Sequence, residues 1–283
     1  MNFKYLSIDR SDGIQTIMLD RPDRLNALNF PMLNEFEEAL RIGNDDDDVR
    51  AVIVSGNGRT FCAGTDLAAG SNTYNGSAAE SYHVDDGIPR DAGGRISLQM
   101  FDYRKPIIAA INGAAVGFGA TMTLPMDVRL ASSEARFGFL FVRRGLVPEA
   151  CSTWFLPRIV GIERALDWVQ TGRIFSAEEA KEGGLVREVV APEALLPRAR
   201  AIARSMINET SAAAASLARR MMWRMLGADH PMTAHRLESQ AMHALRGMPD
   251  FQEGVAAFLE KRPPEFASKP KADSPDSEQW WDK

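Results

Sequence analysis

Two glycine-rich turns are the parts of this sequence best suited to chemistry. They are "GRTFCAGTDL", residues 58–67, and "NGAAVGFGATMTLPMD", residues 112–127, and each follows a short apolar run. This pattern is typical of a buried strand that ends in a turn before a helix. Amides at such a turn are unpaired and partly positive, so one amide from each turn can bind the same oxygen. The turns are therefore either an oxyanion hole or two merely tight connections.

A single acidic residue, Glu149, lies in a third segment of interest, "RRGLVPEACSTWFLPRIVG". It follows Pro148 and is expected to begin a helix. A carboxylate in a site can act as a general base, which removes a proton from a bound molecule. A carboxylate at a helix start is also favoured by the helix dipole without any catalytic role. The residue by itself leaves both interpretations open.

Several other chemistries lack their motifs. There is no G-x-x-x-x-G-K-[ST], no G-x-S-x-G and no H-E-x-x-H. Gly117 and Gly119 begin a dinucleotide fingerprint, but Met122 stands where the third glycine belongs. The four histidines show no metal-binding pattern, so we expect neither a metal nor a resident cofactor. His83 lies in a long polar loop, from which it could reach a site.

The composition is that of an ordinary soluble enzyme-sized chain. It has 283 residues, of which 45% are hydrophobic and 25% charged, enough for one sizeable core. The net charge of −5 gives no reason to expect nucleic-acid or membrane binding, and no apolar run approaches the ~20 residues of a membrane span. Two cysteines and an N-terminus without an apolar signal core favour a cytoplasmic location.

Alternating strand and helix patterns predict an α/β fold. Residues 4–22 contain two apolar-rich runs around Asp12-Gly13, which predicts a hairpin. Helical spacing follows Pro31, with apolar residues at Leu33, Phe36, Ala39 and Leu40. Three short apolar runs then predict parallel strands buried on both faces, namely "AVIV" (51–54), "PIIAAI" (106–111) and "DVRLAS" (127–132).

The rest of the chain divides into a lid, a helical region and a tail. About residues 68–97 are polar and glycine-rich, too long for a simple connection, and we interpret them as a lid. From about residue 162 the pattern becomes helical, and Ser176 with Glu179 forms a capping box. We therefore expect a core domain over 1–200, a helical region over 201–268 and a loose tail over 269–283, from which Trp280 and Trp281 could dock.

Four segments in order resemble the crotonase (enoyl-CoA hydratase/isomerase) superfamily, over roughly residues 9–266. They are "RPDRLNAL", "FCAGTDL", "AAINGAAVGFGATMTLPMDVRLASSEARFGF" and "EGVAAFLEKRPPEF". The resemblance implies the crotonase (ClpP-like) fold, in which repeated ββα units form a spiral core with a C-terminal helical region. It also implies trimerisation through that region, as a homotrimer or a dimer of trimers.

The resemblance further implies an acyl-CoA ligand, with coenzyme A entering as part of the substrate. It places the oxyanion hole at the amides of Thr65 and Phe118, where the second position is usually glycine in the family. Arg24 corresponds to a basic residue near the CoA phosphates, and Lys261 to a helix that reaches a neighbouring subunit's CoA. Either residue can also be an ordinary surface charge. The full set of expected ligand contacts is Arg24, Ala27, Ala63, Asp66, Leu67, Gly117, Phe258 and Lys261.

The acid–base residues separate the subfamilies. The hydratase pair of glutamates falls at Thr121 and Phe141, and neither side chain can act as a general base near neutral pH. Glu149 instead matches the single catalytic glutamate of Δ3,Δ2-enoyl-CoA isomerases, whose segment is of the "PEGCSS" type. In 4-chlorobenzoyl-CoA dehalogenases the equivalent position carries a nucleophilic aspartate.

The resemblance therefore favours a double-bond shift from 3-enoyl-CoA to 2-enoyl-CoA, with Glu149 as the base. The first alternative is a hydratase, or another lyase or hydrolase, that uses a lid carboxylate from Asp85, Asp86 or Asp91. Two further alternatives are a non-catalytic acyl-CoA-binding protein and nucleophilic attack by Glu149 through a covalent adduct. The aromatic residues Phe118, Phe139, Phe141 and Trp154 suggest a bulky apolar pocket for the acyl chain.

Overall fold

The computed structural model describes residues 3–68, 83–85 (backbone alone), 87–275, 277 and 280. The larger of its two main sheets has the strand order β1 (Leu6–Ser11), β2 (Ile14–Leu19), β3 (Ala51–Gly56), β7 (Ile107–Ile111), β9 (Val128–Ser132) and β12 (Glu188–Val190). The smaller sheet has the order β11 (Ile174–Ser176), β10 (Arg136–Gly138), β8 (Ala114–Val116) and β4 (Thr60–Cys62).

A ββα unit repeats along the core. In each unit the first strand joins the larger sheet, the second joins the smaller sheet, and a helix comes later in the chain. The units are β3, β4 and α2 (Ala92–Phe101); β7, β8 and α3 (Phe118–Thr121); and β9, β10 and α4 (Ser152–Val160). Strands β3, β7 and β9 are parallel, so the turns that follow them lie at one edge of the sheet. The predicted α/β fold of repeated ββα units is confirmed.

The predicted N-terminal hairpin is also present. Strands β1 and β2 pair antiparallel around Asp12 and Gly13, which have φ values of 53° and 72°. Positive φ at both central residues gives the turn a twist that matches its strands. The chain then enters α1 (Phe30–Asp45), where the side chain of Asn29 accepts from the Met32 amide and caps the helix.

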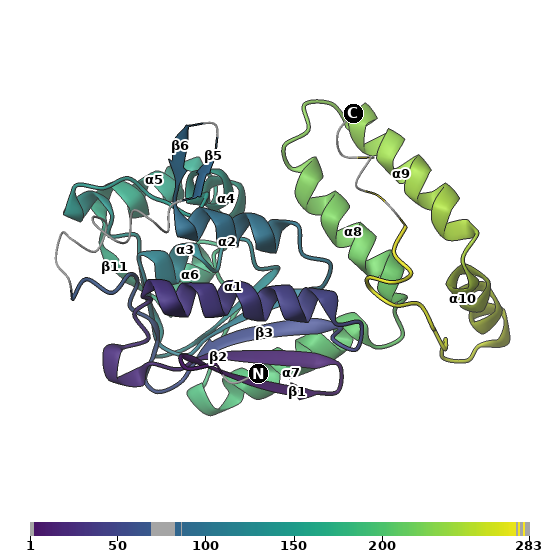
Figure 1. Cartoon of the computed structure of the whole chain (residues 1–283), viewed down its shortest axis with the longest axis horizontal. Helices are drawn as coiled ribbons and strands as arrows, with labels where there is room; N and C mark the ends of the chain where they lie inside the picture. The colour runs from purple at the N-terminus through teal and green to yellow at the C-terminus, as the bar shows by residue number, and fades with distance from the viewer. Residues whose placement is uncertain (1–2, 69–82, 86, 276, 278–279, 281–283) are drawn as a thin grey trace.

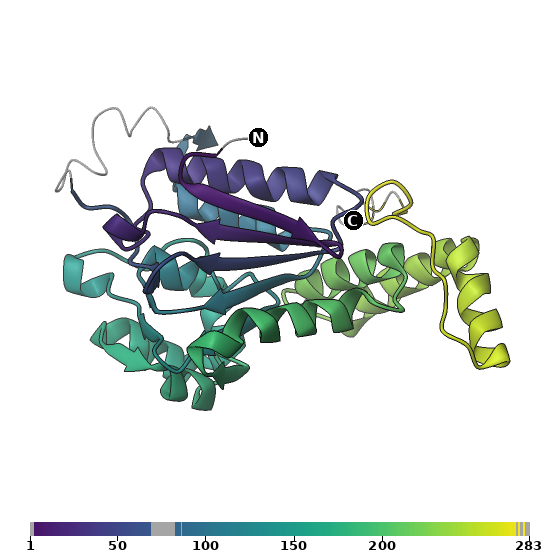
Figure 2. The same cartoon turned by 90° about the horizontal axis from the view of Figure 1, so that it is seen from below.

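Helices α1 and α7 (Leu195–Ile207) cover opposite faces of the larger sheet, as Figure 2 shows. Val54 of β3 packs in the cluster that contains the buried face of α1, and its neighbour Ile53 packs in the cluster that contains α7. This alternation follows from the two-residue period of a strand. The expected boundary after residue 200 therefore falls inside α7, a helix of the core.

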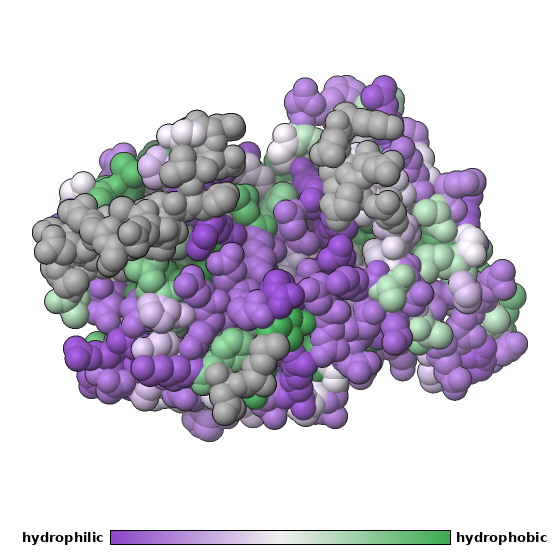
Figure 3. Space-filling model, viewed as in Figure 1, coloured by the Kyte–Doolittle hydropathy of each residue, from purple (hydrophilic) through white to green (hydrophobic). Residues whose placement is uncertain are grey.

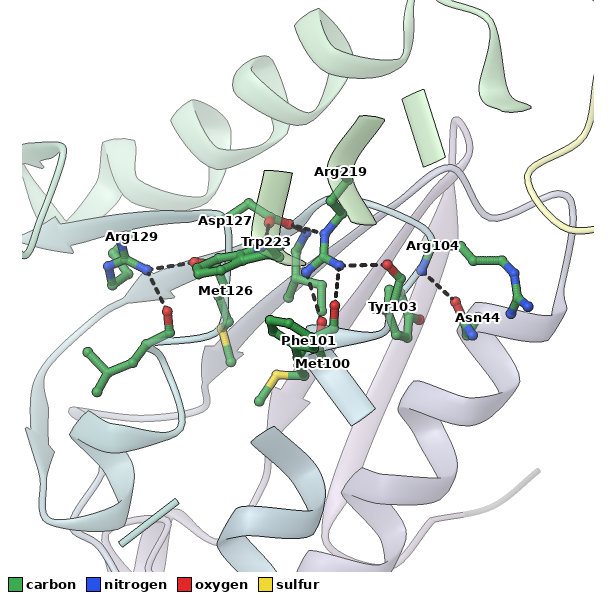
Figure 4. A network of polar contacts seen from close by, with 12 residues as sticks. Asn44, Met100, Phe101, Tyr103, Arg104, Met126, Asp127, Arg129, Arg219 and Trp223 are labelled. Atoms are coloured by element: carbon green, nitrogen blue, oxygen red, sulfur yellow. Dashed lines mark hydrogen bonds and ion pairs between the residues drawn. The ribbon is translucent and has the colours of Figure 1, made fainter. Parts of the chain in front are cut away.

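Helix α8 (Ala212–Met225) leads to α9 (Pro231–Arg246) and α10 (Pro249–Glu260), which lie beside the sheet core in Figure 1. A polar network holds α8 to that core (Figure 4). Asp127, just before β9, accepts from Arg219 Nε at 2.8 Å, from the Ile107 amide at 2.7 Å and from Trp223 Nε1 at 2.8 Å. Arg219 also donates to the backbone carbonyls of Met100, Phe101 and Tyr103.

The remaining helices of the core flank the smaller sheet. They are α5 (Ile162–Thr171) and α6 (Ala177–Glu182). The predicted capping box at the start of α6 is present in its first half, because Ser176 Oγ accepts from the Glu179 amide at 3.1 Å. Glu179 uses its carboxylate elsewhere, accepting from Trp168 Nε1 at 2.9 Å and pairing with Arg173.

The segment expected to be a lid is only partly described. Residues 69–82 and 86, which include Asp86, lie outside the described residues. The later part of the segment is regular structure: β5 (His83–Asp85) pairs with β6 (Ile88–Arg90), and α2 begins at Ala92. The lid interpretation was therefore wrong for its last residues, which form the start of a core helix.

The described part of the C-terminal tail contacts the core, in contrast to the loose tail that we expected. Lys271 Nζ forms an ion pair with Asp45 at the end of α1, at 2.7 Å. Ser277 is buried, and its hydroxyl accepts from Arg220 Nη1 of α8 at 2.9 Å. These bonds hold the tail between α1 and α8.

Apolar side chains remain exposed at the far end of the helical region. Figure 3 shows apolar surface among the polar side chains over α9 and α10. Exposed residues there are Met232, Met242, Phe251, Val255, Phe258 and Leu259. No helix in the described part of the chain has the length and apolar character needed to cross a membrane.

Candidate active site

The second glycine-rich turn presents an unpaired amide at Phe118. Gly117 has φ of 55° and precedes the short helix α3, and its own amide donates to the Gly138 carbonyl at 2.9 Å. Phe118 is the first residue of α3, where an amide has no acceptor within the helix. Among the described residues we find no hydrogen bond from this amide.

The first glycine-rich turn presents a second such amide, at Thr65. The Leu28 amide donates to the Gly64 carbonyl, and the Asp66 amide donates to the Leu28 carbonyl, both at 2.8 Å. These two bonds hold Thr65 beside Leu28 as an isolated parallel bridge. The Thr65 amide itself makes no hydrogen bond with any described residue.

The two turns touch each other. Gly64 has φ of 94°, and a Cβ atom at this position would lie 2.8 Å from the Val116 carbonyl oxygen and 3.7 Å from the Phe118 amide nitrogen. A Cβ at Gly119 would likewise lie 2.2 Å from the Cys62 carbonyl oxygen. Bare glycines therefore allow the close approach that brings the Thr65 and Phe118 segments together.

Glu149 lies close to the Phe118 turn, beside the start of α2. Its Oε1 accepts from the Thr121 hydroxyl at 2.7 Å. A Cβ at Gly93 of α2 would lie 2.2 Å from Glu149 Oε2 and 2.6 Å from Cε2 of the Phe118 ring. Oε2 and the Phe118 side chain therefore both lie against Gly93, where α2 has no side chain. The side chain is half-buried and does not extend into open solvent.

Asp91 brings a second carboxyl group to Glu149. It is the N-cap of α2, and its Oδ1 accepts from the Gly94 amide at 2.6 Å. The adjacent Gly93 faces Glu149 Oε2, so both carboxyl groups lie at the first turn of α2.

Burial raises the pKa of Glu149 to about 8. The Thr121 hydroxyl opposes this shift because it stabilises the ionised form, whereas the negative charge of Asp91 increases it. A carboxylate with a pKa near the working pH combines basic strength with a useful ionised fraction. The environment of Glu149 therefore suits a general base.

Glu149→Gln is expected to change the pH dependence of stability. The raised pKa means that the folded protein binds more protons here than the unfolded chain, whose Glu pKa is about 4.5. Stability from this group is therefore lost as the pH rises from about 4.5 to about 8. Urea unfolding at a series of pH values should show the variant gaining stability over the wild type across this window. If the difference in unfolding free energy between the variant and the wild type were the same at every pH, the prediction would be contradicted.

The segment that carries Glu149 has a strained backbone. Ala150 and Cys151 have φ values of 58° and 57°, in the left-handed region that favours glycine. Ala150 is also fully buried. Such strain persists only where the surrounding structure imposes it, and it is frequent at functional sites.

Ala150→Gly is expected to stabilise the protein by about 1 kcal/mol, because glycine removes the left-handed strain. Ala180, fully buried in the regular helix α6, is a matched control. There the same substitution should destabilise by about 1 kcal/mol through loss of helix propensity. Thermal or urea unfolding measures both variants, and a destabilised Ala150→Gly would show that the left-handed backbone is not a source of strain.

Comparisons with known proteins identify the family of the chain. The chain matches the enoyl-CoA hydratase/isomerase family over residues 9–269. The enoyl-CoA hydratase ACTT3 of Alternaria alternata is 42% identical over 257 residues, covering 90% of this chain and 83% of that protein. The 1,2-epoxyphenylacetyl-CoA isomerase of Escherichia coli is 33% identical over 263 residues, covering 91% and 96%. The crystal structure of an enoyl-CoA hydratase from Bacillus anthracis is 32% identical, with a TM-score of 0.82 over 93% of this chain and 99% of that one.

The chain belongs to the enoyl-CoA hydratase/isomerase family. It is thus an enzyme of a family that acts on acyl-CoA substrates, and the crotonase resemblance seen in the sequence is confirmed. The family also accounts for the two-turn architecture, since the segments quoted for the resemblance are those that form the turns.

Apart from Gly117, which precedes α3, the residues expected near CoA fall into two groups in this family member. One group lies next to the Thr65 turn, where Arg21 connects Ala27 and Asp66. Its guanidinium donates to the Ala27 carbonyl at 2.6 Å and pairs with the Asp66 carboxylate at 3.0 Å. Ala63 belongs to the same region, since its amide donates to the Leu25 carbonyl at 3.1 Å. Asp66 therefore has a structural partner, which sequence reasoning did not identify.

Arg24 and Leu67 also lie in this region, with their side chains exposed. Phe258 and Lys261 belong to the second group, at the end of α10. Figure 1 shows α10 at the opposite end of the molecule from α2 and α3, so a single chain does not bring these residues to the site. Phe258 is 82% exposed, so its ring has little contact with its own chain.

The expected aromatic pocket is present only in part. Phe139 is fully buried and stacks on Trp168 and Phe175, so its assignment to the acyl pocket was wrong. Trp154 does line a cavity of about 750 Å³, together with Cys151, two residues from Glu149. Its other large apolar lining residues are Leu98, Phe101, Phe155, Met225, Leu237 and Trp280, and its polar lining residues are Arg224, Thr233, Arg236 and Gln240.

Sequence reasoning missed the roles of Thr121 and Gly93. Thr121 was considered only as a residue that cannot replace a catalytic glutamate, whereas its hydroxyl holds Glu149. Gly93 leaves the space that Glu149 and Phe118 share. Asp91 before Ala-Gly-Gly was recognisable as a helix cap. No local pattern could show that the cap also reaches Glu149.

Proposed function

We propose that the protein shifts a carbon–carbon double bond in an acyl-CoA thioester, converting a 3-enoyl-CoA to a 2-enoyl-CoA. The observation that carries this proposal is the half-buried carboxyl of Glu149, whose Oε2 faces the Phe118 side chain where the Thr65 and Phe118 turns meet. Among the described residues neither the Thr65 amide nor the Phe118 amide has a hydrogen-bond partner. An oxyanion hole and one base are the two elements that such a reaction needs.

In the proposed reaction the thioester oxygen accepts hydrogen bonds from the Thr65 and Phe118 amides. Glu149 Oε2 removes a proton from C2, and the electron pair of that bond delocalises onto the thioester oxygen. The same proton then returns to C4, and the double bond moves between C2 and C3. Each amide donor is expected to stabilise the charged intermediate by ~3 kcal/mol. No water is added, so one carboxylate suffices.

The positions of Thr121 and Phe141 support isomerisation over ordinary hydration. Thr121 donates its hydroxyl to Glu149 and Phe141 is nearly buried, so neither can orient an attacking water as a carboxylate would. Thr121 also leaves Glu149 Oε2 as the oxygen that faces Phe118.

Addition of water to a 2-enoyl-CoA is the second candidate, and one observation favours it. Asp91 caps α2 beside Gly93, which Glu149 Oε2 faces, so the site contains two carboxyl groups after all. One could activate a water while the other supplies a proton. Several relatives are named enoyl-CoA hydratases, including the Alternaria protein that is 42% identical.

The proposal includes assembly into a trimer or a dimer of trimers through the C-terminal helices. The exposed apolar residues of α9 and α10 support it, because an apolar patch of this kind is typical of an interaction surface. Assembly would also give Phe258 and Lys261 a route to the CoA of a neighbouring subunit. Arg24 and the Ala63–Leu67 turn would contact CoA within one chain.

A panel of CoA thioesters tests the proposal. Matched 3-enoyl-CoA and 2-enoyl-CoA substrates of increasing chain length are assayed for isomerisation and for hydration. We expect isomerisation to dominate, with proton exchange at C2 and C4. Faster hydration, lost when Asp91 is replaced, would favour the second candidate. Tight binding without turnover would indicate a non-catalytic protein, and a covalent adduct on Glu149 in mass spectra would indicate nucleophilic attack.

A further inference from the structure

Two carboxyl groups, those of Asp91 and Glu149, lie at the start of helix α2. Asp91 Oδ1 binds the Gly94 amide at 2.6 Å, and a Cβ at Gly94 would lie 2.7 Å from Asp91 Oδ2. The adjacent Gly93 faces Glu149 Oε2. Two consecutive glycines therefore leave room for two carboxyl groups on one turn of helix. A cap alone would need neither the second carboxyl nor the second glycine.

We propose that Asp91 is a positioning residue whose negative charge, at the same helix turn as Glu149, makes Glu149 a stronger base. Asp91 is held there by its bond to the Gly94 amide, and Glu149 Oε2 faces the neighbouring Gly93. Glu149 Oε1 is held by the Thr121 hydroxyl, which fixes the carboxyl group relative to α3. The charge of Asp91 disfavours the ionised form of Glu149 and so increases its affinity for the C2 proton.

The neighbouring ionisable groups are few among the described residues. Cys151 lies in the same segment, and its pKa is raised by burial and then by the charges of Asp91 and Glu149, with Arg90 opposing. Cys62 is fully buried, and its pKa is raised by burial to about 12, with a further contribution from Glu149. Neither thiol ionises near neutral pH, and Arg90 is the cation that these effects identify near the pair.

Asp91→Asn tests the proposal, because asparagine caps a helix as well as aspartate does but carries no charge. Kinetically, the acid limb of the kcat/KM profile should move to lower pH by on the order of one unit. The plateau should also fall, since the base is weaker. Asp102→Asn at the other end of α2 is the control: its carboxylate is exposed and pairs with Arg224, and the limb should not move. An unmoved limb in Asp91→Asn would overturn the proposal.

This kinetic readout rests on the proposed function, so an activity-independent measurement accompanies it. Urea unfolding at fixed protein concentration is measured from pH 5 to pH 8.5 for the wild type, Asp91→Asn, Glu149→Gln and the double variant. Asp91→Asn should raise the unfolding midpoint progressively with pH when Glu149 is present, and by a constant amount when it is glutamine. The same pH dependence in both backgrounds would show that the carboxyl groups are uncoupled and would overturn the proposal even if the isomerase reaction is real.

Discussion

Glu149→Gln is expected to lower kcat for isomerisation by about a thousandfold, within the usual range for removal of a general base. Glutamine has nearly the same shape and can still bind the Thr121 hydroxyl, so the site should keep its geometry. It cannot accept the C2 proton. The loss should appear in kcat while the apparent substrate affinity changes little, because the oxyanion amides and the CoA contacts remain.

The matched control for this variant is Glu163→Gln, in the exposed first turn of α5. It removes the same charge from the same chemical group, and full activity is expected. The measurement is the initial rate of 2-enoyl-CoA formation at pH 8. If Glu149→Gln retained more than a tenth of the wild-type rate, another group would have to be the base, and Asp91 would be the first to examine.

Arg219→Leu is expected to destabilise the protein by about 3–5 kcal/mol, as is typical when one partner of a buried ion pair is removed. Arg219 and Asp127 have side chains that are 8% and 17% exposed. Removing the guanidinium leaves a carboxylate without its cation and leaves the carbonyls of Met100, Phe101 and Tyr103 without a donor. These groups connect α8 to the end of α2 and the segment that follows it, so the whole helical region should dock less tightly.

Arg198→Leu provides the control for this second prediction. Arg198 pairs with Glu188 at 2.9 Å, but both side chains are considerably exposed. Such a pair contributes at most about 1 kcal/mol. Urea unfolding at one protein concentration compares the two variants. If Arg219→Leu and Arg198→Leu lowered the unfolding free energy by similarly small amounts, the network of Figure 4 would not be what holds α8 to the core.

Local signals predicted the frame of the fold well. The hairpin at Asp12-Gly13, the helix after Pro31 and the buried parallel strands follow from turn chemistry and from the spacing of apolar residues. These features depend on interactions between residues close in sequence or on a simple period. The same reasoning located the two glycine-rich turns, whose bare backbones allow the close approach of Gly64 to Phe118.

Features that depend on distant contacts were not predictable in this way. The tail composition suggested a loose segment, yet Lys271 reaches Asp45 and Ser277 is buried against Arg220. Phe139 looked like a pocket residue but stacks in the core, because its strand-end position points it toward Trp168. The sequence offered Asp91 and Glu149 as separate candidate carboxylates, but nothing local showed that both lie at the first turn of α2.

The most direct test of the central claim is a crystal structure with a saturated acyl-CoA of the best substrate's chain length. The proposal predicts that the thioester oxygen lies within hydrogen-bonding distance of the Thr65 and Phe118 amides. It also predicts Glu149 Oε2 at roughly 3–3.5 Å from C2, the separation of groups poised to react. A thioester bound away from these amides, or a Glu149 carboxyl turned into solvent in the complex, would contradict the claim that this carboxylate and these amides act on one substrate.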